Sequence, residues 1–419
     1  MWDADAGGDE DGGGGGAGVE DVFVVKLDPG GTPLWAVTFG GPANDRVESL
    51  AVGVTGVVVT GSYAGTADFG GGPIAAGSPD ASLYLVALDP DGSYVWGRVF
   101  DADRSAVGTS VDMDADGNVI LLGSFSDART DVGGGPLESE SGGGFLAKYD
   151  PEGQHVWSQL ASAAEMAVDD RGRVVTAGWA PDSAFGLSWY EATGSPTDTL
   201  TFPIDGGFPW DVAAGAAGAA FCASFWGTVD FGGGPLPSRP SPGAETPCVA
   251  SFDADGAHAW SRSSGTGGNG QCRSVSMDAS GEVAIGGGFY GSLDWGGTPI
   301  ANAGAIGEAY VARFDPAGGN VFGRSFPGTE NAAAVTHAEI DGARTVVAGS
   351  FRGSLALDGE TLVSAGELDG WACALDAAGA VTWSLQFGDA ARQIVNALAV
   401  DADGNVFLAG VFQGDLGLP

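Results

Sequence analysis

Apolar residues in this chain occur in short runs that end at an acidic residue and are followed by a glycine-containing turn. The first run extends from Val22 to Leu27 and ends at Asp28, and Trp35 lies seven positions after that anchor. Later anchors and their aromatic residues are Asp89 with Trp96, Asp150 with Trp157, Asp253 with Trp260, Asp315 with Phe322 and Asp376 with Trp383. A short apolar run bounded by turn residues predicts a β-strand. Each copy therefore predicts one antiparallel hairpin.

A seventh copy, residues 185 to 191, keeps the strand and the turn but has Asp198 where the aromatic residue should stand. The seven acidic anchors lie at positions 28, 89, 150, 191, 253, 315 and 376, so successive spacings are 61, 61, 41, 62, 62 and 61. Such a regular period indicates a repeat architecture. The fourth unit is about 20 residues short, which either opens one side of the fold or reflects sequence drift.

A second hairpin lies between successive anchors, as in residues 111 to 123, where two apolar strands flank an Asp-Gly turn. Each unit thus has four short strands, and four antiparallel strands form one propeller blade. No helical period of similar strength is present. The sequence predicts an all-β fold, a seven-bladed β-propeller with four antiparallel strands in each blade.

The chain opens with an outer hairpin at Val22 and closes with an inner hairpin at residues 394 to 410. Neither is a complete blade, so we expect the N- and C-terminal strands to share one blade and close the ring, which removes exposed sheet edges. We therefore predict a single propeller domain over residues 22–419. Residues 1–21 are acidic and glycine-rich, and we expect a flexible tail or linker there.

The formal net charge is −38, which disfavours binding to nucleic acid or to anionic lipid surfaces. No apolar stretch approaches the roughly 18 to 20 residues that a transmembrane helix needs, and the amino terminus shows no export signal. We expect a monomer without a transmembrane segment and without bound nucleic acid.

The units resemble those of a bacterial seven-bladed β-propeller repeat family called SBBP. The residues that carry the resemblance are Phe23 to Asp28, Trp35, Phe39 to Gly41, Val400-Asp401, Gly404 to Val406 and Gly410 to Phe412. The resemblance covers nearly everything after residue 21. It implies the propeller fold and an extracellular or cell-surface location. One way to reach the cell surface is lipid anchoring through an N-terminal segment that has been removed. It implies no shared active site.

One stretch is a candidate calcium site. Asp112, Asp114 and Asp116 alternate before Gly117, as at the start of a calcium-binding loop in which oxygen ligands converge on a hard cation. The glutamate expected at the twelfth position is replaced by Gly123. Because Asp-Gly also forms an ordinary hairpin turn, a purely structural interpretation stays open. No other cofactor is expected.

Long loops on one face of the predicted blades are the natural place for binding residues. Four of these loops repeat a motif in which an aspartate and an apolar residue precede glycines and a proline, as at residues 68 to 73. Recurrence favours a scaffold role for that motif. Trp226 and Trp295, which lie near these loops, are candidate ligand contacts.

The four cysteines, Cys222, Cys248, Cys272 and Cys373, lack the spacing of a metal site. Adjacent strands would bring Cys222 and Cys248 together as the preferred disulfide, and Cys248 with Cys272 is the rival pairing. Buried free thiols are the alternative.

The leading functional hypothesis is a non-enzymatic secreted or surface-displayed propeller that presents its long-loop face to a protein or glycan partner. The first alternative is a purely structural envelope protein. The second is a hydrolase or lyase that uses a carboxylate pair, and it requires converging Asp or Glu side chains that break the repeat pattern.

Overall fold

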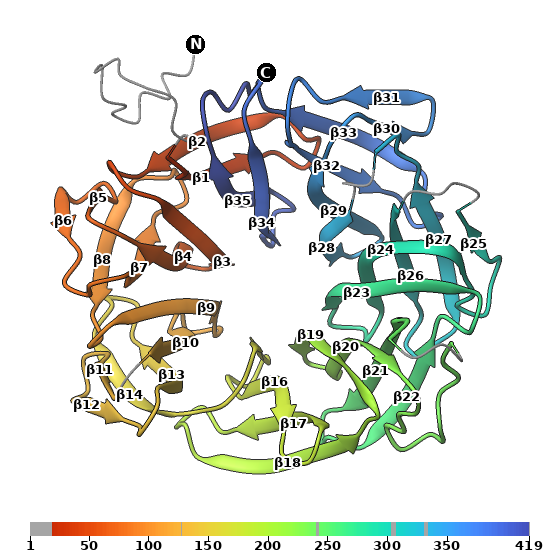
Figure 1. Cartoon of the computed structure of the whole chain (residues 1–419), viewed down its shortest axis with the longest axis horizontal. Helices are drawn as coiled ribbons and strands as arrows, with labels where there is room; N and C mark the ends of the chain where they lie inside the picture. Colours follow the sequence, from red (N-terminus) through yellow and green to blue (C-terminus); the bar gives the residue numbers. More distant parts are fainter. Residues whose placement is uncertain (1–18, 127, 240–242, 303–306, 331–333, 419) are drawn as a thin grey trace. The chain divides into compact units, whose positions relative to one another are not determined.

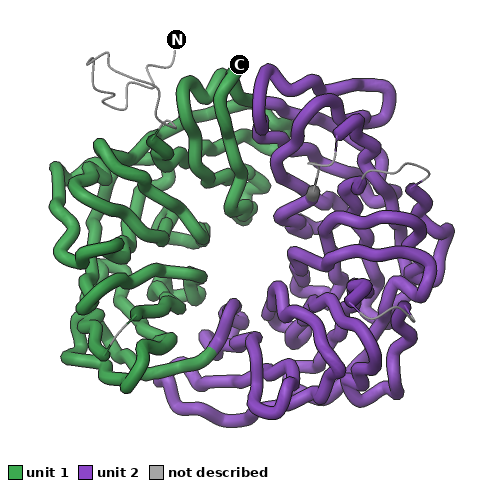
Figure 2. The backbone as a smooth tube through the Cα atoms, in the orientation of Figure 1, with its two compact units in different colours: residues 1–162, 387–419 green, residues 163–386 purple. Residues whose placement is uncertain are grey.

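The computed structural model describes residues 19–126, 128–239, 243–302, 307–330 and 334–418, and these residues form β-strands and loops with no helix (Figure 1). They divide into two compact units, residues 1–162 with 387–419 and residues 163–386 (Figure 2). The first 18 residues of the predicted tail lie outside the described residues. The first strand begins at Asp21, one residue inside the predicted tail.

Unit 1 contains three four-stranded antiparallel sheets, here called blades 1 to 3. Blade 1 has the order β2 (Pro33–Phe39), β1 (Asp21–Leu27), β35 (Val406–Phe412) and β34 (Gln393–Val400). Blade 2 contains β3 (Asp45–Gly53), β4 (Gly56–Tyr63), β7 (Ser82–Leu88) and β8 (Tyr94–Phe100). Blade 3 contains β9 (Ser105–Met113), β10 (Val119–Ser126), β13 (Gly143–Tyr149) and β14 (His155–Leu160). Small hairpins in their long loops are β5 (Thr66–Asp68) with β6 (Pro73–Ala75), and β11 (Arg129–Asp131) with β12 (Pro136–Glu138).

Unit 2 holds blades 4 to 7, and β33 ends one residue beyond it. Blade 4 contains β15 (Glu165–Val168), β16 (Val174–Ala180), β17 (Ala184–Tyr190) and β18 (Pro196–Pro203). Blade 5 contains β19 (Gly206–Gly215), β20 (Gly218–Trp226), β21 (Thr246–Asp253) and β22 (His258–Ser263). Blade 6 contains β23 (Gly268–Met277), β24 (Val283–Leu293), β26 (Glu308–Phe314) and β27 (Asn320–Phe326), with β25 (Ile300–Ala301) paired to β24. Blade 7 contains β28 (Ala334–Asp341), β29 (Arg344–Phe351), β32 (Asp369–Leu375) and β33 (Val381–Phe387), and β30 (Ser354–Leu357) pairs with β31 (Glu360–Val363).

Seven four-stranded antiparallel sheets confirm the predicted fold class, a seven-bladed β-propeller. The predicted sharing of blade 1 by the two chain ends is also confirmed, since β1 pairs with β35 from Asp21 opposite Phe412 to Leu27 opposite Val406. That residues 22–419 form one domain stays a prediction. The structure describes no helix long and apolar enough to cross a bilayer.

The repeated acidic anchors close the turns of the blades. In the first turn, Oδ1 of Asp28 accepts hydrogen bonds from the main-chain N–H groups of Gly30 and Thr32, both at 2.9 Å. Four of the aromatic residues that lie seven positions after an anchor pack against the turn glycine of the next repeat: Trp35 on Gly92, Trp96 on Gly153, Trp260 on Gly318 and Phe322 on Gly379. Trp96 donates from Nε1 to the carbonyl oxygen of Pro151 at 2.9 Å. The two most regular sequence signals are therefore a turn cap and a blade-to-blade contact.

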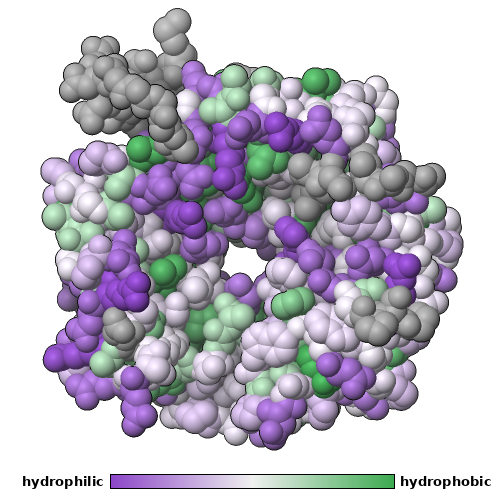
Figure 3. Space-filling model, in the orientation of Figure 1, coloured by the Kyte–Doolittle hydropathy of each residue, from purple (hydrophilic) through white to green (hydrophobic). Residues whose placement is uncertain are grey.

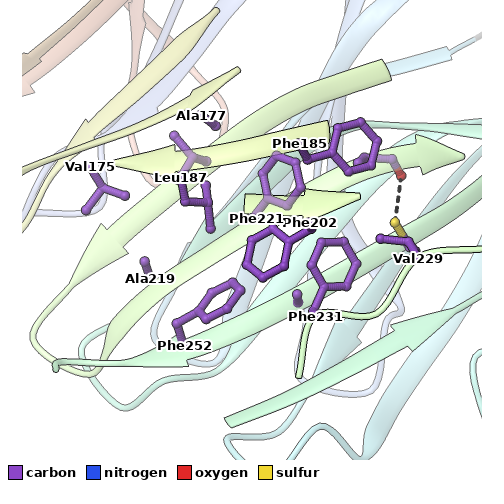
Figure 4. Packing of buried hydrophobic residues seen from close by; sticks show 14 of the residues in the cluster. Val175, Ala177, Phe185, Leu187, Phe202, Ala219, Phe221, Val229, Phe231 and Phe252 are labelled. Atoms are coloured by element: carbon purple, nitrogen blue, oxygen red, sulfur yellow. Dashed lines mark hydrogen bonds between the residues drawn. The ribbon is translucent and has the colours of Figure 1, made fainter. Parts of the chain in front are cut away.

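Blades 4 and 5 pack around an aromatic core (Figure 4). Phe185 and Phe221 lie edge to face with ring centroids 5.6 Å apart, and Phe202 meets Phe231 in the same way at 5.0 Å. These rings come from different sheets, so their burial joins the two blades. Such packing contributes about 0.5–1.5 kcal/mol per aromatic pair beyond the area that it buries.

Blade 4 is formed by the short repeat unit, and the missing residues are those of the loop between its second and third strands. Only residues 181–183 join β16 to β17, whereas the equivalent loops of blades 2 and 3 are long enough to form a small hairpin. Asp182 and Ser183 adopt positive φ angles of 61° and 57°, which non-glycine residues rarely do. This tight turn leaves the end of β16 without a covering hairpin.

Candidate functional site

Exposed aromatic side chains mark one region of unit 2. Among the described residues, the exposed aromatic side chains are Trp179, Phe208 and Tyr290, with 49%, 42% and 42% of their surface accessible. They lie near the end of β16, near the start of β19 and near the end of β24. These strand ends belong to the side of the blades that carries the long loops, which is the face that the sequence favoured for binding.

Four of the rings in this region touch and form what we call the aromatic surface: Trp179, Phe208, Trp210 and Trp226. Phe208 is its centre, with ring centroids 6.2 Å from Trp179, 6.0 Å from Trp210 and 5.9 Å from Trp226. Beneath it, Trp179 also contacts the fully buried Phe185 at 6.0 Å. The exposed rings therefore rest on the rigid core of blades 4 and 5 rather than on a free loop.

Local sequence explains why these rings gather. The register of β19 against β20 shifts between Pro209 and Asp211, so Trp210 is the extra residue of a β-bulge. Its Nε1 donates a hydrogen bond of 2.9 Å to Oγ of Ser224. Gly206 lies directly under Trp226, where a Cβ would come within 2.2 Å of the indole ring. Glycine at this position thus allows the indole to pack flat on the backbone.

Polar side chains from blades 5 and 6 border the aromatic surface. The guanidinium of Arg273 lies 5.7 Å from the Trp210 ring, a cation–π distance. Arg273 also donates from Nε and Nη2 to Oε1 of Gln271, at 3.0 and 2.8 Å. Burial raises the pKa of the Glu245 carboxyl, while Gln271 and Arg273 oppose that rise. An aromatic platform is thus flanked by an amide, a guanidinium and a carboxyl group.

The structure places the two predicted ligand contacts, Trp226 and Trp295, in different surroundings. Trp226 belongs to the aromatic surface and contacts Phe208. Trp295 is only 2% exposed and stacks on Tyr310 with ring centroids 6.1 Å apart, so a ligand cannot reach it in this structure. The repeated loop motif places Trp295 in the core, where Phe69 and Phe231 also lie in their own blades.

The three aspartates of the predicted calcium loop do not converge. Oδ1 of Asp114 accepts hydrogen bonds from the N–H groups of Asp116 and Asn118, and Lys148 donates to its Oδ2 at 2.8 Å. Asp112 instead lies on β9 and accepts from the N–H group of Met113. Among the described residues, no group of three or more His, Cys, Asp or Glu is arranged to hold a metal ion. Calcium at this turn stays an untested prediction to which the geometry gives no support.

The predicted disulfides are wrong in this structure, where all four cysteines are buried free thiols. Cys222 lies opposite Val249, and Cys248 lies opposite Ala223, so the two cysteines are one position out of register. Because side chains alternate along a strand, Cys222 and Cys248 point to opposite faces of blade 5. Cys222 instead packs beside Cys272 and donates to its carbonyl oxygen at 3.4 Å. Cys248 belongs to the core on the other face, which also separates it from Cys272.

Sequence reasoning missed Trp179, Phe208 and Trp210 as site residues. The available signal was the departure of residues 179 to 210 from the repeat, which left open whether this region was an opening or drift. The structure shows that the short loop uncovers aromatic rings, so the departure has a structural consequence at the surface.

No protein-family model and no curated protein matches the chain. Solved structures resemble it in fold. The WD40 β-propeller domain of Doa1 is 12% identical and covers 91% of this chain and 97% of its own, with a TM-score of 0.47. Sqt1 from Chaetomium thermophilum is 12% identical, with 90% and 98% covered and a TM-score of 0.45. The β-propeller domain of the Trilobed protease from Pyrococcus furiosus is 8% identical, with 88% and 95% covered and a TM-score of 0.43. At these identities the likeness concerns the fold alone, and it is the seven four-stranded sheets of the chain itself that define it as a β-propeller.

Proposed function

We propose that this chain is a non-enzymatic, glycan-binding β-propeller whose aromatic surface stacks on sugar rings. The observation that carries the proposal is the contact of Phe208 with Trp179, Trp210 and Trp226, in which Trp179 and Phe208 are exposed. Exposed aromatic groups on a rigid support mark interaction sites, because water solvates their faces poorly. The apolar C–H faces of a pyranose ring match such faces in size and shape.

The polar border supports a carbohydrate rather than a wholly apolar ligand. Sugar hydroxyl groups both donate and accept hydrogen bonds, and Gln271, Arg273 and Glu245 offer donors and acceptors beside Trp210. Binding sites of this kind combine apolar rings with a few placed polar groups. Because the stacking rings are exposed side chains, we expect an extended oligosaccharide with modest affinity.

The setting belongs to the same proposal. The resemblance of the repeat units to the SBBP family favours an extracellular or cell-surface protein, and a net charge of −38 favours a protein that stays dispersed. A glycan-binding surface suits that location. On the face drawn in Figure 3, many hydrophilic groups lie over the part of unit 1 near the C-terminal end of the chain.

A panel of oligosaccharides screened by isothermal titration calorimetry tests this function. At least one sugar should bind the wild type, and Trp179→Ala and Phe208→Ala should each weaken binding by tenfold or more. Leu34→Ala is the matched control, because Leu34 is an exposed apolar residue in unit 1 at 44% accessibility. It should leave the affinity unchanged.

Two results would contradict the proposal. If no sugar binds while a protein partner is lost in the Phe208→Ala variant, the aromatic surface is a protein interface. If a bound oligosaccharide is cleaved by the wild type, the chain is an enzyme, and chromatography of the titrated mixture would detect the products.

A further inference from the structure

A second cluster lies in unit 1, where the start of β1 meets the start of β3. Asp45 is fully buried, and its main-chain N–H donates to the carbonyl oxygen of Glu20 at 2.8 Å. Among the described residues, neither carboxylate oxygen of Asp45 accepts a hydrogen bond of good geometry, although the N–H groups of Gly41 and Ala64 lie close enough to lower its pKa. Oδ1 of Asp21 and the phenol oxygens of Tyr63 and Tyr84 also lack a well-formed hydrogen bond. Five buried oxygen atoms are therefore poorly satisfied in one small region.

The position of Asp45 breaks the repeat. Asp45 pairs with Tyr63, and the residues at the same place in other blades pair with an aromatic residue in the same register: Ala106 with Phe125, Gly270 with Phe289, and Gln393 with Phe412. Of these, Gln393 is polar, and its amide donates to the carbonyl oxygen of Gln413 and to Oδ1 of Asp389. The scaffold thus tolerates a small or a neutral side chain here. The packing that the blades share does not explain why a carboxylate, Asp45, stands at this position.

The carboxylates of Asp21 and Asp45 lie close together in this buried region. Burial raises the pKa of Asp45 to about 7, and the nearby charge of Asp21 adds to the rise, while the N–H groups of Gly41 and Ala64 oppose it. Burial also raises the pKa of Asp21. Glycine at position 40 leaves room for the Asp21 carboxylate, because a Cβ there would lie 1.9 Å from its Oδ1. The two charges are close enough to repel each other in a poorly solvated site.

In the described part of the chain, the nearby basic side chains pair with Glu20 and not with Asp21 or Asp45. Arg392 and Arg46 approach Glu20, with nitrogen–oxygen distances of 3.4 and 4.0 Å. No ion pair to Asp21 or Asp45 occurs among the described residues. An uncompensated buried carboxylate costs several kcal/mol, so the pair needs either a bound proton or a cation.

We propose that Asp21 and Asp45 bind a calcium ion that ties blade 1 to blade 2. Both carboxylates supply hard oxygen ligands, and a divalent ion balances their two charges. The phenols of Tyr63 and Tyr84 stay protonated, because burial raises the pKa of Tyr63 to about 12 and that of Tyr84 further still. They can contribute neutral oxygens or orient water. The remaining ligands come from main-chain carbonyl groups and water, since no third acidic group joins the pair in the described part of the chain.

Terbium luminescence and thermal melting together test the site on the full chain after treatment with EGTA. Terbium ions replace calcium, and the adjacent tyrosines should sensitise their emission. Emission should appear in the wild type, calcium should quench it competitively, and calcium should raise Tm. Asp45→Asn and Asp21→Asn should each weaken calcium binding by at least tenfold, and Tyr84→Phe should lower the emission with little change in affinity.

Asp114→Asn is the matched control, because it removes a buried carboxylate of the same unit that is already paired with Lys148. It should keep the terbium signal and the calcium shift. The proposal is overturned if calcium leaves the wild-type Tm unchanged, or if Asp45→Asn keeps the wild-type calcium affinity. Asp45→Asn is isosteric, and far-UV circular dichroism checks that it folds.

Discussion

The rings of Trp179 and Phe208 meet edge to face across two blades, with centroids 6.2 Å apart and planes inclined at 80°. Trp179 is the second-last residue of β16, which is followed by only three loop residues, and Phe208 is the third residue of β19, the first strand of the next blade. The loss of a covering hairpin and the gain of an exposed aromatic contact thus occur at the same place. The aromatic surface therefore differs from the repeated aromatic residues of the scaffold, which recur in most blades.

Replacing Phe208 with alanine should change the free energy of unfolding by less than about 1 kcal/mol, because much of the ring is already exposed. Urea denaturation of the variant and the wild type measures the difference. Phe221→Ala, which removes a fully buried ring of the same blade, should cost about 3–5 kcal/mol. A comparable loss for Phe208→Ala would mean that the ring is structural and would weaken the binding proposal.

Trp96→Phe should destabilise the protein by about 1–2 kcal/mol, because it removes the indole hydrogen bond to Pro151 and part of the packing on the next turn. The neighbouring Val95→Ala is the control, since Val95 is exposed and should cost less than about 0.5 kcal/mol. Thermal unfolding of the three proteins gives the comparison. Equal melting curves for Trp96→Phe and Val95→Ala would show that the blade-to-blade hydrogen bond contributes nothing measurable.

Lys148→Met should cost about 1–3 kcal/mol at neutral pH, because it leaves the buried carboxylate of Asp114 without its cation. Burial alone would raise the pKa of Asp114, yet hydrogen bonds from Lys148 and Asn118 lower it below its usual value. A lowered pKa stabilises the fold above the unfolded value of 3.8, and this stability disappears as the pH falls through the folded pKa. The variant should therefore lose less stability than the wild type during acid titration.

Deleting residues 394–419 should abolish cooperative unfolding, because the deletion removes nearly all of β34 and β35 and leaves β1 without its partner along seven register positions. A blade reduced to β1 and β2 is a two-stranded hairpin, which is marginal in water. Calorimetry and far-UV circular dichroism check this outcome. An unchanged melting transition would show that the terminal blade is dispensable.

In the presence of EGTA, stability should fall as the pH rises from about 4 to 7. Folded Asp45 holds a proton up to about pH 7, whereas the unfolded residue releases it near 3.8. Each such group contributes at most about 1.4 kcal/mol per pH unit. Asp211, whose pKa burial also raises to about 7, acts in the same direction.

Asp45→Asn and Asp211→Asn should therefore each flatten part of this slope. Calcium should restore stability at pH 7 and above in Asp211→Asn but not in Asp45→Asn. Chemical denaturation across this pH range measures both effects. A slope that Asp45→Asn leaves unchanged would show that its carboxyl group titrates normally.

Local patterns were sufficient to predict the blades because each strand and turn is encoded within a few residues. Asp28 and its equivalents close turns through their own backbone neighbours, so their spacing marks hairpins along the chain. The disulfide prediction failed because it was based on spacing along the sequence alone. Whether Cys222 and Cys248 face each other depends on a one-residue register, which spacing along the sequence does not reveal.

The sequence by itself determined the repeat, the number of blades and the sharing of one blade by both chain ends, since strand periodicity and turn chemistry are short-range properties. Tertiary structure decided which aromatic residues reach the surface and which carboxylates lie together. Trp226 and Trp295 both lie near long loops in the sequence, yet Trp226 contacts the exposed Phe208 and Trp295 packs in the core. Asp21 and Asp45 meet because β1 and β3 begin side by side, and their burial shifts their pKa values only in the folded chain. Burial and charge proximity arise from long-range packing, which no local pattern encodes.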